Sequence, residues 1–262
     1  MDRREAILRE LNLYPLWVRR NVPVSVVEAI ETSAPAALQQ MPATSRLGEA
    51  DTQQIAIGNA KPVLREVKGL KPSYISSLDW PQLKQQVRDC TACKLRAGCT
   101  QTVFGVGDEN ADWLLVGEGP GADEDALGEP FVGQAGKLLD SMLAAIKLKR
   151  GKNVYIANVV KCRPHDNRTP AAGEIAQCLP YLERQIELIQ PRLIVAFGKV
   201  ASNALLGREA TLGSLRGTLH DYHGIPLIVT YHPAYLLRSP TEKAKAWQDL
   251  CFAVKVMADK SA

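Results

Sequence analysis

The sequence predicts an α/β protein whose parallel sheet is covered by helices on both faces. Four short apolar or β-branched runs lie between residues 113 and 231, and stretches with apolar residues at helical spacing separate them. Strands that alternate with helices are typical of parallel sheets, because each return to the same edge requires a crossover. The 262 residues are enough for one sizeable domain with some sequence left over.

Each element has its own signal in the sequence. The predicted strands are Trp113–Gly117, Val154–Val160, Leu193–Phe197 and Pro226–Tyr231. The predicted helices are Ala135–Leu148, Tyr181–Ile189, Val200–Leu206 and Thr241–Met257. Ser239 and Pro240 precede the last helix, as a cap and a first-turn proline would. Since ligands of parallel sheets bind at the carboxyl ends of strands, we expect the functional site there.

The chain divides into three predicted regions. Residues 1–30 form an N-terminal peptide with charged and apolar residues, and residues 31–78 are rich in Ala, Pro, Ser, Thr and Gln. The second region shows no sustained periodicity of its apolar residues, which indicates a flexible linker. Residues 79–262 carry the alternating pattern and form the predicted domain.

Bulk properties bound the class of protein. The formal charge of +4 and the pI near 8.7 give mild support for a polyanionic partner. No apolar run approaches the roughly 18 residues that a membrane span needs, and the opening MDRREAILRE lacks the apolar core of a signal peptide. These features predict a cytoplasmic protein, in which cysteines bind metal or are simply buried rather than forming disulfides.

Four cysteines have the spacing of a metal site. Cys90 and Cys93 are separated by two residues, Cys162 follows the second predicted strand, and Cys178 lies beyond a further fifteen residues. A Cys-x2-Cys turn and a second pair from a loop can provide four sulfur ligands, which suit either zinc or an iron–sulfur cluster. The alternative is burial as small apolar residues, and the predicted convergence of all four weakens it.

Two further cysteines fit this pattern less well. Cys99 is close enough in sequence to Cys93 to be a candidate for a spare ligand, although the spacing favours the other four. Cys251 lies on the apolar face of the last predicted helix, where we expect it to be part of the core.

A glycine-rich, acidic loop follows the first predicted strand. It reads GEGPGADED from Gly117 and continues to GEPFVG at residues 128–133. Such a turn lets a ligand approach the backbone, but the loop lacks Gly-Lys-Ser/Thr and is acidic, which excludes a nucleotide-phosphate loop. Phe131 could stack on a neutral base, or it could be a core residue.

Polar residues follow two other predicted strands. The Asn158 amide can donate and accept, as reading a pyrimidine edge requires, although it could equally satisfy a loop backbone. His232 precedes a proline and is placed to hydrogen-bond a developing anion, where a structural role is the alternative. Leu236 and Leu237 with Arg238 at a helix start suggest an apolar wedge beside a phosphate contact.

These motifs together resemble the family 4 uracil-DNA glycosylases, whose members carry a [4Fe-4S] cluster. The resemblance covers roughly residues 79–262, and its motifs are GEGPGADED, GEPFVG, NVVKCRP, LRG at Leu215–Gly217, and HPAYLLRSP. It implies a three-layer α/β/α sandwich with a central four-stranded parallel sheet. It also implies a hydrolase that flips uracil out of DNA and cleaves its N-glycosidic bond.

The resemblance also assigns roles to individual residues, as expectations. Cys90, Cys93, Cys162 and Cys178 would hold a structural cluster. Glu118, Gly119 and Pro120 would line the uracil pocket, with Phe131 stacked on the base, Asn158 reading its edge and His232 stabilising the uracil anion. Leu236, Leu237, Arg238 and Ser239 would contact DNA. The resemblance assigns no general base, and Glu118 and Glu124 are the candidates for it. We expect a monomer.

The opening RREAILRELNLYPLWVRR is not explained by a glycosylase. Its paired Arg3 and Arg4, spaced leucines, Trp17 and terminal arginines resemble the N-terminal peptide of the psi subunit of the DNA polymerase III clamp loader. Two hypotheses follow: a repair glycosylase that residues 1–22 tether to replication proteins, or a psi-type adaptor on a glycosylase-like scaffold. The complete set of pocket residues favours the enzyme. The alternative for the peptide is an amphipathic helix that packs on the domain or stays loose.

Overall fold

The computed structural model describes residues 72–259. The predicted N-terminal peptide and residues 31–71 of the predicted linker lie outside the described residues. The last part of that linker region instead belongs to the domain, because helix α2 (Pro72–Ile75) lies there and Ile75 and Leu78 are buried in the core. The folded part therefore includes residues before Asp79.

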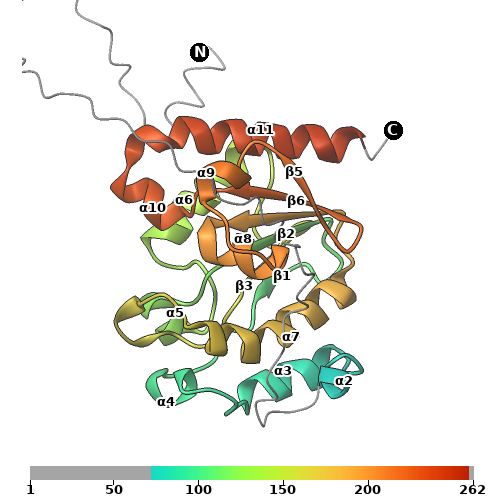
Figure 1. Ribbon diagram of the computed structural model, residues 1–262, viewed down its shortest axis with the longest axis vertical. Coiled ribbons are helices and arrows are strands. Elements are labelled where there is room, and N and C mark those ends of the chain that lie inside the picture. Colours follow the sequence, from blue (N-terminus) through green and yellow to red (C-terminus); the bar gives the residue numbers. More distant parts are fainter. Residues whose placement is uncertain (1–71, 260–262) are drawn as a thin grey trace, which may run out of the picture. The chain divides into compact units, whose positions relative to one another are not determined.

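A mixed sheet forms the centre of the described residues, with the strand order β1-β3-β2-β4-β6-β5 (Figure 1). The strands are β1 (Val106–Gly107), β2 (Trp113–Gly117), β3 (Val154–Asn158), β4 (Leu193–Phe197), β5 (Leu219–Tyr222) and β6 (Ile225–Thr230). The four middle strands run parallel, as expected, whereas β1 and β5 pair antiparallel at the two edges. The expected four-stranded sheet is therefore the centre of a larger, mixed one.

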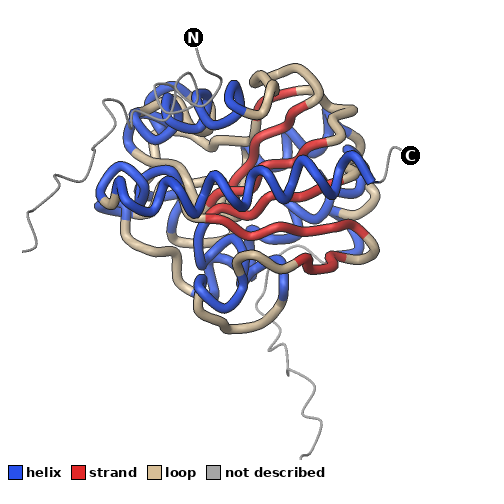
Figure 2. The backbone as a smooth tube through the Cα atoms, turned by 90° about the horizontal axis from the view of Figure 1, so that it is seen from above, coloured by secondary structure: helices blue, strands red, loops and turns tan. Residues whose placement is uncertain are grey.

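Helices cover both faces of this sheet. They are α2, α3 (Trp80–Arg88), α4 (Leu95–Gly98), α5 (Ala122–Leu127), α6 (Gln134–Ala145), α7 (Ala172–Ile189), α8 (Gly198–Leu206), α9 (Leu212–Leu215), α10 (Pro233–Arg238) and α11 (Lys243–Asp259), with 3-10 turns η2 (His165–Asn167) and η3 (Pro240–Glu242). Figure 1 shows α11 on one face and α3 and α7 on the other, and Figure 2 shows α11 crossing the strands. No helix in the described range has the length and apolar character to span a membrane.

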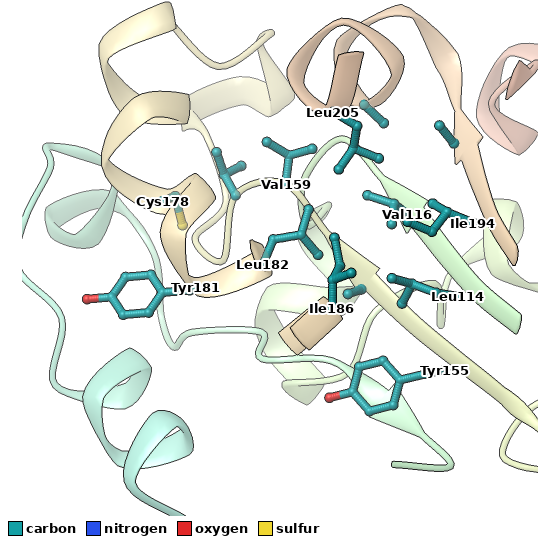
Figure 3. Packing of buried hydrophobic residues seen from close by; sticks show 14 of the residues in the cluster. Leu114, Val116, Tyr155, Val159, Cys178, Tyr181, Leu182, Ile186, Ile194 and Leu205 are labelled. Carbon is teal, nitrogen blue, oxygen red and sulfur yellow. The ribbon is translucent and has the colours of Figure 1, made fainter. Parts of the chain in front are cut away.

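The alternation of side chains along each strand divides the core into two layers. Leu114 and Val116 pack in the layer of α3, α7 and α8, where Figure 3 shows them near Leu182 and Ile186 of α7. Their neighbours in β2 face the opposite layer, which α6 and α11 complete. All five residues of β2 are buried, as strands covered on both faces require, and this explains their continuous apolar sequence.

Two helices and the place of one cysteine differ from the predictions. Helix α7 begins at Ala172 rather than Tyr181, because it accommodates Pro180 in its interior, where proline normally ends a helix. Helix α10 was not among the predicted helices. Cys251 is exposed on α11, so its predicted place in the core is wrong.

The register places the carboxyl ends of the parallel strands along one edge. Gly117 of β2 lies opposite Asn158 of β3, and Phe197 of β4 lies opposite Thr230 of β6. Strand β2 has β3 on one side and β4 on the other. The strand order therefore reverses beside β2, because β3 is added on one side of it and β4 on the other. Such a switch point opens a crevice at the strand ends.

We predict that Gly136→Ala destabilises the fold, although alanine is the better helix former by about 1 kcal/mol. A Cβ at this position of α6 would overlap the backbone carbonyl group of Phe131, so the free energy of unfolding should fall by about 1–3 kcal/mol. Gly173→Ala in α7 is the matched control, because open space surrounds that position. Urea denaturation of both variants tests this, and equal stabilities would contradict the steric argument.

Candidate active site and cysteine cluster

A pocket of about 700 Å³ opens at the carboxyl edge of the parallel strands. Its walls come from segments that follow or end each of the four parallel strands. Its size falls in the range of about 300–1,000 Å³ typical of ligand sites. The structure brings the following predicted residues to this pocket: Glu118, Gly119, Pro120, Glu124, Phe131, Asn158, His232 and Arg238.

Asn158 is the last residue of β3 and is almost completely buried. Its Oδ1 atom has no hydrogen-bond partner among the described residues. Gly117 beside it leaves the space that Asn158 needs, since a Cβ there would clash with this oxygen and lie 2.6 Å from the Phe131 ring. An unpaired buried acceptor costs about 1–3 kcal/mol. The Asn158 Oδ1 atom is therefore placed to accept a hydrogen bond from a bound ligand.

Phe131 forms an aromatic wall of the pocket. Its ring centroid lies 5.4 Å from that of His232 at an interplanar angle of 27°, and its backbone has a φ of 55°. This left-handed conformation is costly for a non-glycine residue and occurs often at functional sites. Arg150 stabilises it by donating hydrogen bonds to the carbonyl oxygens of Phe131 at 2.7 Å and Pro130 at 2.9 Å. No sequence motif indicated this role of Arg150.

His232 caps the N-terminus of α10 with its ring. The Ala234 N–H donates to Nδ1 at 3.2 Å, so the proton of a neutral ring resides on Nε2. Burial lowers the pKa of His232 to about 4, and the positive charge of Arg238 adds to this effect. The ring is thus a neutral hydrogen-bond donor at neutral pH. Gly198 makes room for it, because its φ is 84° and a Cβ there would lie 3.2 Å from the His232 Cβ.

The two acidic candidates have different environments. Glu118 directly follows β2, and burial raises the pKa of its carboxyl above the ordinary value. Glu124 accepts hydrogen bonds from the backbone N–H groups of Val132 at 2.9 Å, Gly133 at 3.1 Å and Gly121 at 3.0 Å. These bonds tie the two loops of the pocket wall together. The geometry therefore gives Glu124 a positioning role, and its role as a base stays a prediction.

The predicted DNA wedge needs a correction. Leu236 is 1% exposed and packs in the core, so it is wrong as a DNA contact, whereas Leu237 is 44% exposed. Consecutive helix positions point about 100° apart, and only one of the two leucines can face α6. Tyr235, which the sequence analysis missed, is 38% exposed and lines the pocket. Ser239 ends α10, and its N–H donates to the Tyr235 carbonyl oxygen.

Basic residues missed by the sequence analysis also line the pocket. Arg168 makes a two-pronged contact with Glu174 at 2.7 and 2.8 Å. Lys199, in the first turn of α8, lies 3.3 Å from the Glu209 carboxylate. With Arg238, they add cations around the opening.

The four predicted cysteines line one small apolar cavity. Cys90 follows α3, Cys93 precedes α4, Cys162 follows β3, and Cys178 lies in α7. Burial raises the pKa of the Cys178 thiol to about 12 and raises that of Cys162 as well. Within residues 72–259, no group of His, Cys, Asp or Glu side chains has the spacing to hold a single metal ion. The four thiols therefore share one small cavity.

Lys161 connects this cavity to the pocket. Its backbone N–H donates to the Cys178 Sγ at 3.2 Å, and its Nζ donates to the Asn158 carbonyl oxygen at 2.9 Å and to Gln185 Oε1 at 2.6 Å. The side chain is 1% exposed, and burial lowers its pKa to about 8. Cys99 does not line the cavity, but its thiol is hydrogen-bonded to that of Cys162 and also contacts Arg96.

The sequence is similar to known proteins along most of the described range. The model of the Uracil DNA glycosylase superfamily matches residues 104–251, more than half of the chain. The Type-4 uracil-DNA glycosylase of Pyrobaculum aerophilum is 41% identical over 66% of this chain and 92% of its own length. The Type-4 enzymes of Archaeoglobus fulgidus and Thermotoga maritima are 41% and 42% identical, over 63% and 62% of this chain and 86% and 85% of their own lengths. The chain therefore belongs to the uracil-DNA glycosylase superfamily and, within it, to the type-4 uracil-DNA glycosylases.

Proposed function

We propose that this protein is a uracil-DNA glycosylase that flips uracil out of DNA and hydrolyses its N-glycosidic bond, in base-excision repair. The observation that carries the proposal is the buried, unpartnered Oδ1 of Asn158 in a pocket walled by Phe131 and His232. This combination provides a hydrogen-bond acceptor, a stacking surface and a neutral donor, which are the groups that a uracil ring requires.

The Asn158 side chain distinguishes uracil from cytosine in this proposal. Its free oxygen accepts the N3–H of uracil, whereas cytosine presents an acceptor at the same ring position. Two acceptors facing each other in a buried site leave both unpaired, which is strongly unfavourable. The crowded wall around Phe131 and Gly117 would exclude the methyl group of thymine.

His232 stabilises the leaving group. Cleavage leaves negative charge on uracil and positive charge on the sugar, so a donor aimed at a base oxygen stabilises the transition state more than the ground state. The Nε2–H of neutral His232 supplies that donor. Glu118 is then the group that orients and deprotonates the attacking water, because Glu124 is occupied by three backbone N–H groups.

DNA contacts surround the opening. Leu237 provides the exposed apolar wedge that occupies the space of the flipped nucleotide. Arg238, Lys199 and Arg168 provide positive charge for the phosphates.

The cysteine cavity fits a [4Fe-4S] cluster held by Cys90, Cys93, Cys162 and Cys178. Four thiols surround an apolar cavity, as the ligation of such clusters requires. Four thiolates could also hold one zinc ion, and the resemblance to the family 4 glycosylases, whose members carry a [4Fe-4S] cluster, favours iron. When bound, the cluster supplies cross-links between α3, the loop before α4, the loop after β3, and α7, which is a structural role.

The psi-type adaptor is the less favoured alternative, because the family match covers the pocket-bearing part of the chain. A partner-binding arm in residues 1–30, tied to the domain by a linker, stays a prediction. So do contact with clamp-loader proteins, the cytoplasmic location and the monomeric state.

The proposed pocket is tested with Asn158→Ala and His232→Ala. Each should lower the rate of uracil release from a labelled oligonucleotide by about 10²–10³-fold, the usual effect of removing one transition-state hydrogen bond. His223→Ala removes an exposed histidine outside the pocket and should retain the wild-type rate. Single-turnover assays measure this step directly. If folded wild-type protein releases no uracil, the proposed function is wrong.

The pH dependence tests Glu118 as the base. The ionised carboxylate is the active form and its pKa is raised by burial, so the release rate should fall as pH drops through a value above that of an ordinary glutamate. His232, with a pKa of about 4, stays neutral across this range. In Glu118→Gln the rate should be lower, and the decrease of the rate at low pH should disappear. If the rate of that variant still decreases at low pH as in the wild type, Glu118 is excluded as the titrating group.

The proposed cluster is tested by iron and sulfide analysis with visible absorption. Purified anaerobically, the wild type should be brown, and serine variants of Cys90, Cys93, Cys162 or Cys178 should lose iron and colour. Cys251→Ser is the matched control, because that thiol is exposed on α11, and Cys99→Ser should also retain iron. A colourless protein that contains zinc would contradict the assignment.

A further inference from the structure

A stack of aromatic and cationic groups lies beside the residues assigned to uracil. The rings of Tyr231 and Tyr235 are nearly parallel, with centroids 5.2 Å apart and an interplanar angle of 18°. The guanidinium of Arg216 lies 4.3 Å from the Tyr231 ring centroid. Both tyrosines line the pocket, and Tyr235 is 38% exposed. A large aromatic surface at a pocket opening is typical of a binding contact.

Arg216 is anchored by hydrogen bonds to Asp249 and to the backbone of Lys245. Its Nε donates to Asp249 at 2.7 Å and its Nη2 donates to the Lys245 carbonyl oxygen at 2.8 Å. Asp249 is 3% exposed and also accepts from Thr230 Oγ1 at 2.7 Å. Burying the Arg216–Asp249 ion pair costs free energy. The pair fixes the Arg216 guanidinium over the Tyr231 ring, which is the role that we assign to it. Arg216 is also the middle residue of the Leu215–Gly217 motif, which has no role in the uracil site described above.

The pocket is larger than one base requires. Asn158, Phe131 and His232 account for a single pyrimidine, whereas the remaining wall includes Tyr231 and Tyr235 with the apolar Leu212 and the cation of Lys199. Aromatic rings for stacking and cations for the backbone are the chemistry that recognises nucleotides in single strands.

We propose that Tyr235, braced by Tyr231 and Arg216, stacks on the base adjacent to the flipped uridine in the same strand. This inference rests on the proposed function and adds a second-base subsite to it. The spacing suits two consecutive nucleotides, because Tyr235 lies one helical turn from His232, with its N–H donating to the His232 carbonyl oxygen at 2.9 Å. A base held in this way leaves its own stack, so single-stranded DNA satisfies the subsite most easily.

The test couples the tyrosine to the neighbouring base. Uracil release is measured against enzyme concentration on three single-stranded oligonucleotides: one intact, and two with an abasic residue 5′ or 3′ of the uridine. One abasic substrate should raise the half-saturating concentration of the wild type by about 10-fold, since stacking on one base contributes about 1–3 kcal/mol. Tyr235→Ala should show that loss on intact DNA and no further loss on the abasic substrate. Tyr235→Phe should behave as the wild type.

Tyr74→Ala is the matched control, since Tyr74 is an exposed tyrosine of α2 outside the pocket, and it should leave all three curves unchanged. If Tyr235→Ala weakens binding equally on intact and abasic DNA, the stacking proposal is overturned. If the wild type responds to neither abasic substrate, it is overturned as well. Both outcomes still include uracil release and so differ from a failure of the proposed function, in which no substrate is cleaved.

Discussion

The buried side chain of Lys161 is the contact on which both sites depend. An ammonium group without water is tolerable only if polar atoms surround it, and here Asn158 and Gln185 provide them. Gln185 in turn donates to the Phe104 carbonyl oxygen at 3.0 Å, which extends the network to the segment that leads into β1. The backbone at the end of β3 is consequently fixed by Lys161, while the side-chain oxygen of Asn158 stays without a partner among the described residues.

The pocket is assembled from close contacts that leave little freedom before a ligand binds. Gly117 brings Asn158 and Phe131 together because any larger residue would displace them. Glu124 fixes two loops through backbone N–H groups, and Arg150 stabilises the strained backbone of Phe131. Preorganised groups of this kind stabilise charge that develops in a reaction without first having to reorient. The position of each group therefore matters as much as its chemical type.

The central strands and most of the pocket were predictable from the sequence because both have short-range signals. Strands buried on both faces read as apolar runs, and the functional side chains follow directly at their ends. The edge strands gave no such signal, since β1 has two residues and β5 is largely exposed. The choice between Leu236 and Leu237 depends on how α10 packs against α6, and the role of Glu124 depends on N–H groups from another loop. Neither is encoded in local spacing.

The order of residues after β3 explains how one short segment belongs to both sites. Asn158 lines the pocket, whereas Lys161 and Cys162 line the cysteine cavity. Of the other three cysteines, Cys90 follows α3, Cys93 precedes α4 and Cys178 lies in α7. The chain returns to the pocket at Pro164, only two residues after Cys162. The contact between the Lys161 Nζ and the Asn158 carbonyl oxygen ties the backbone that carries the Asn158 amide to the segment that carries Cys162.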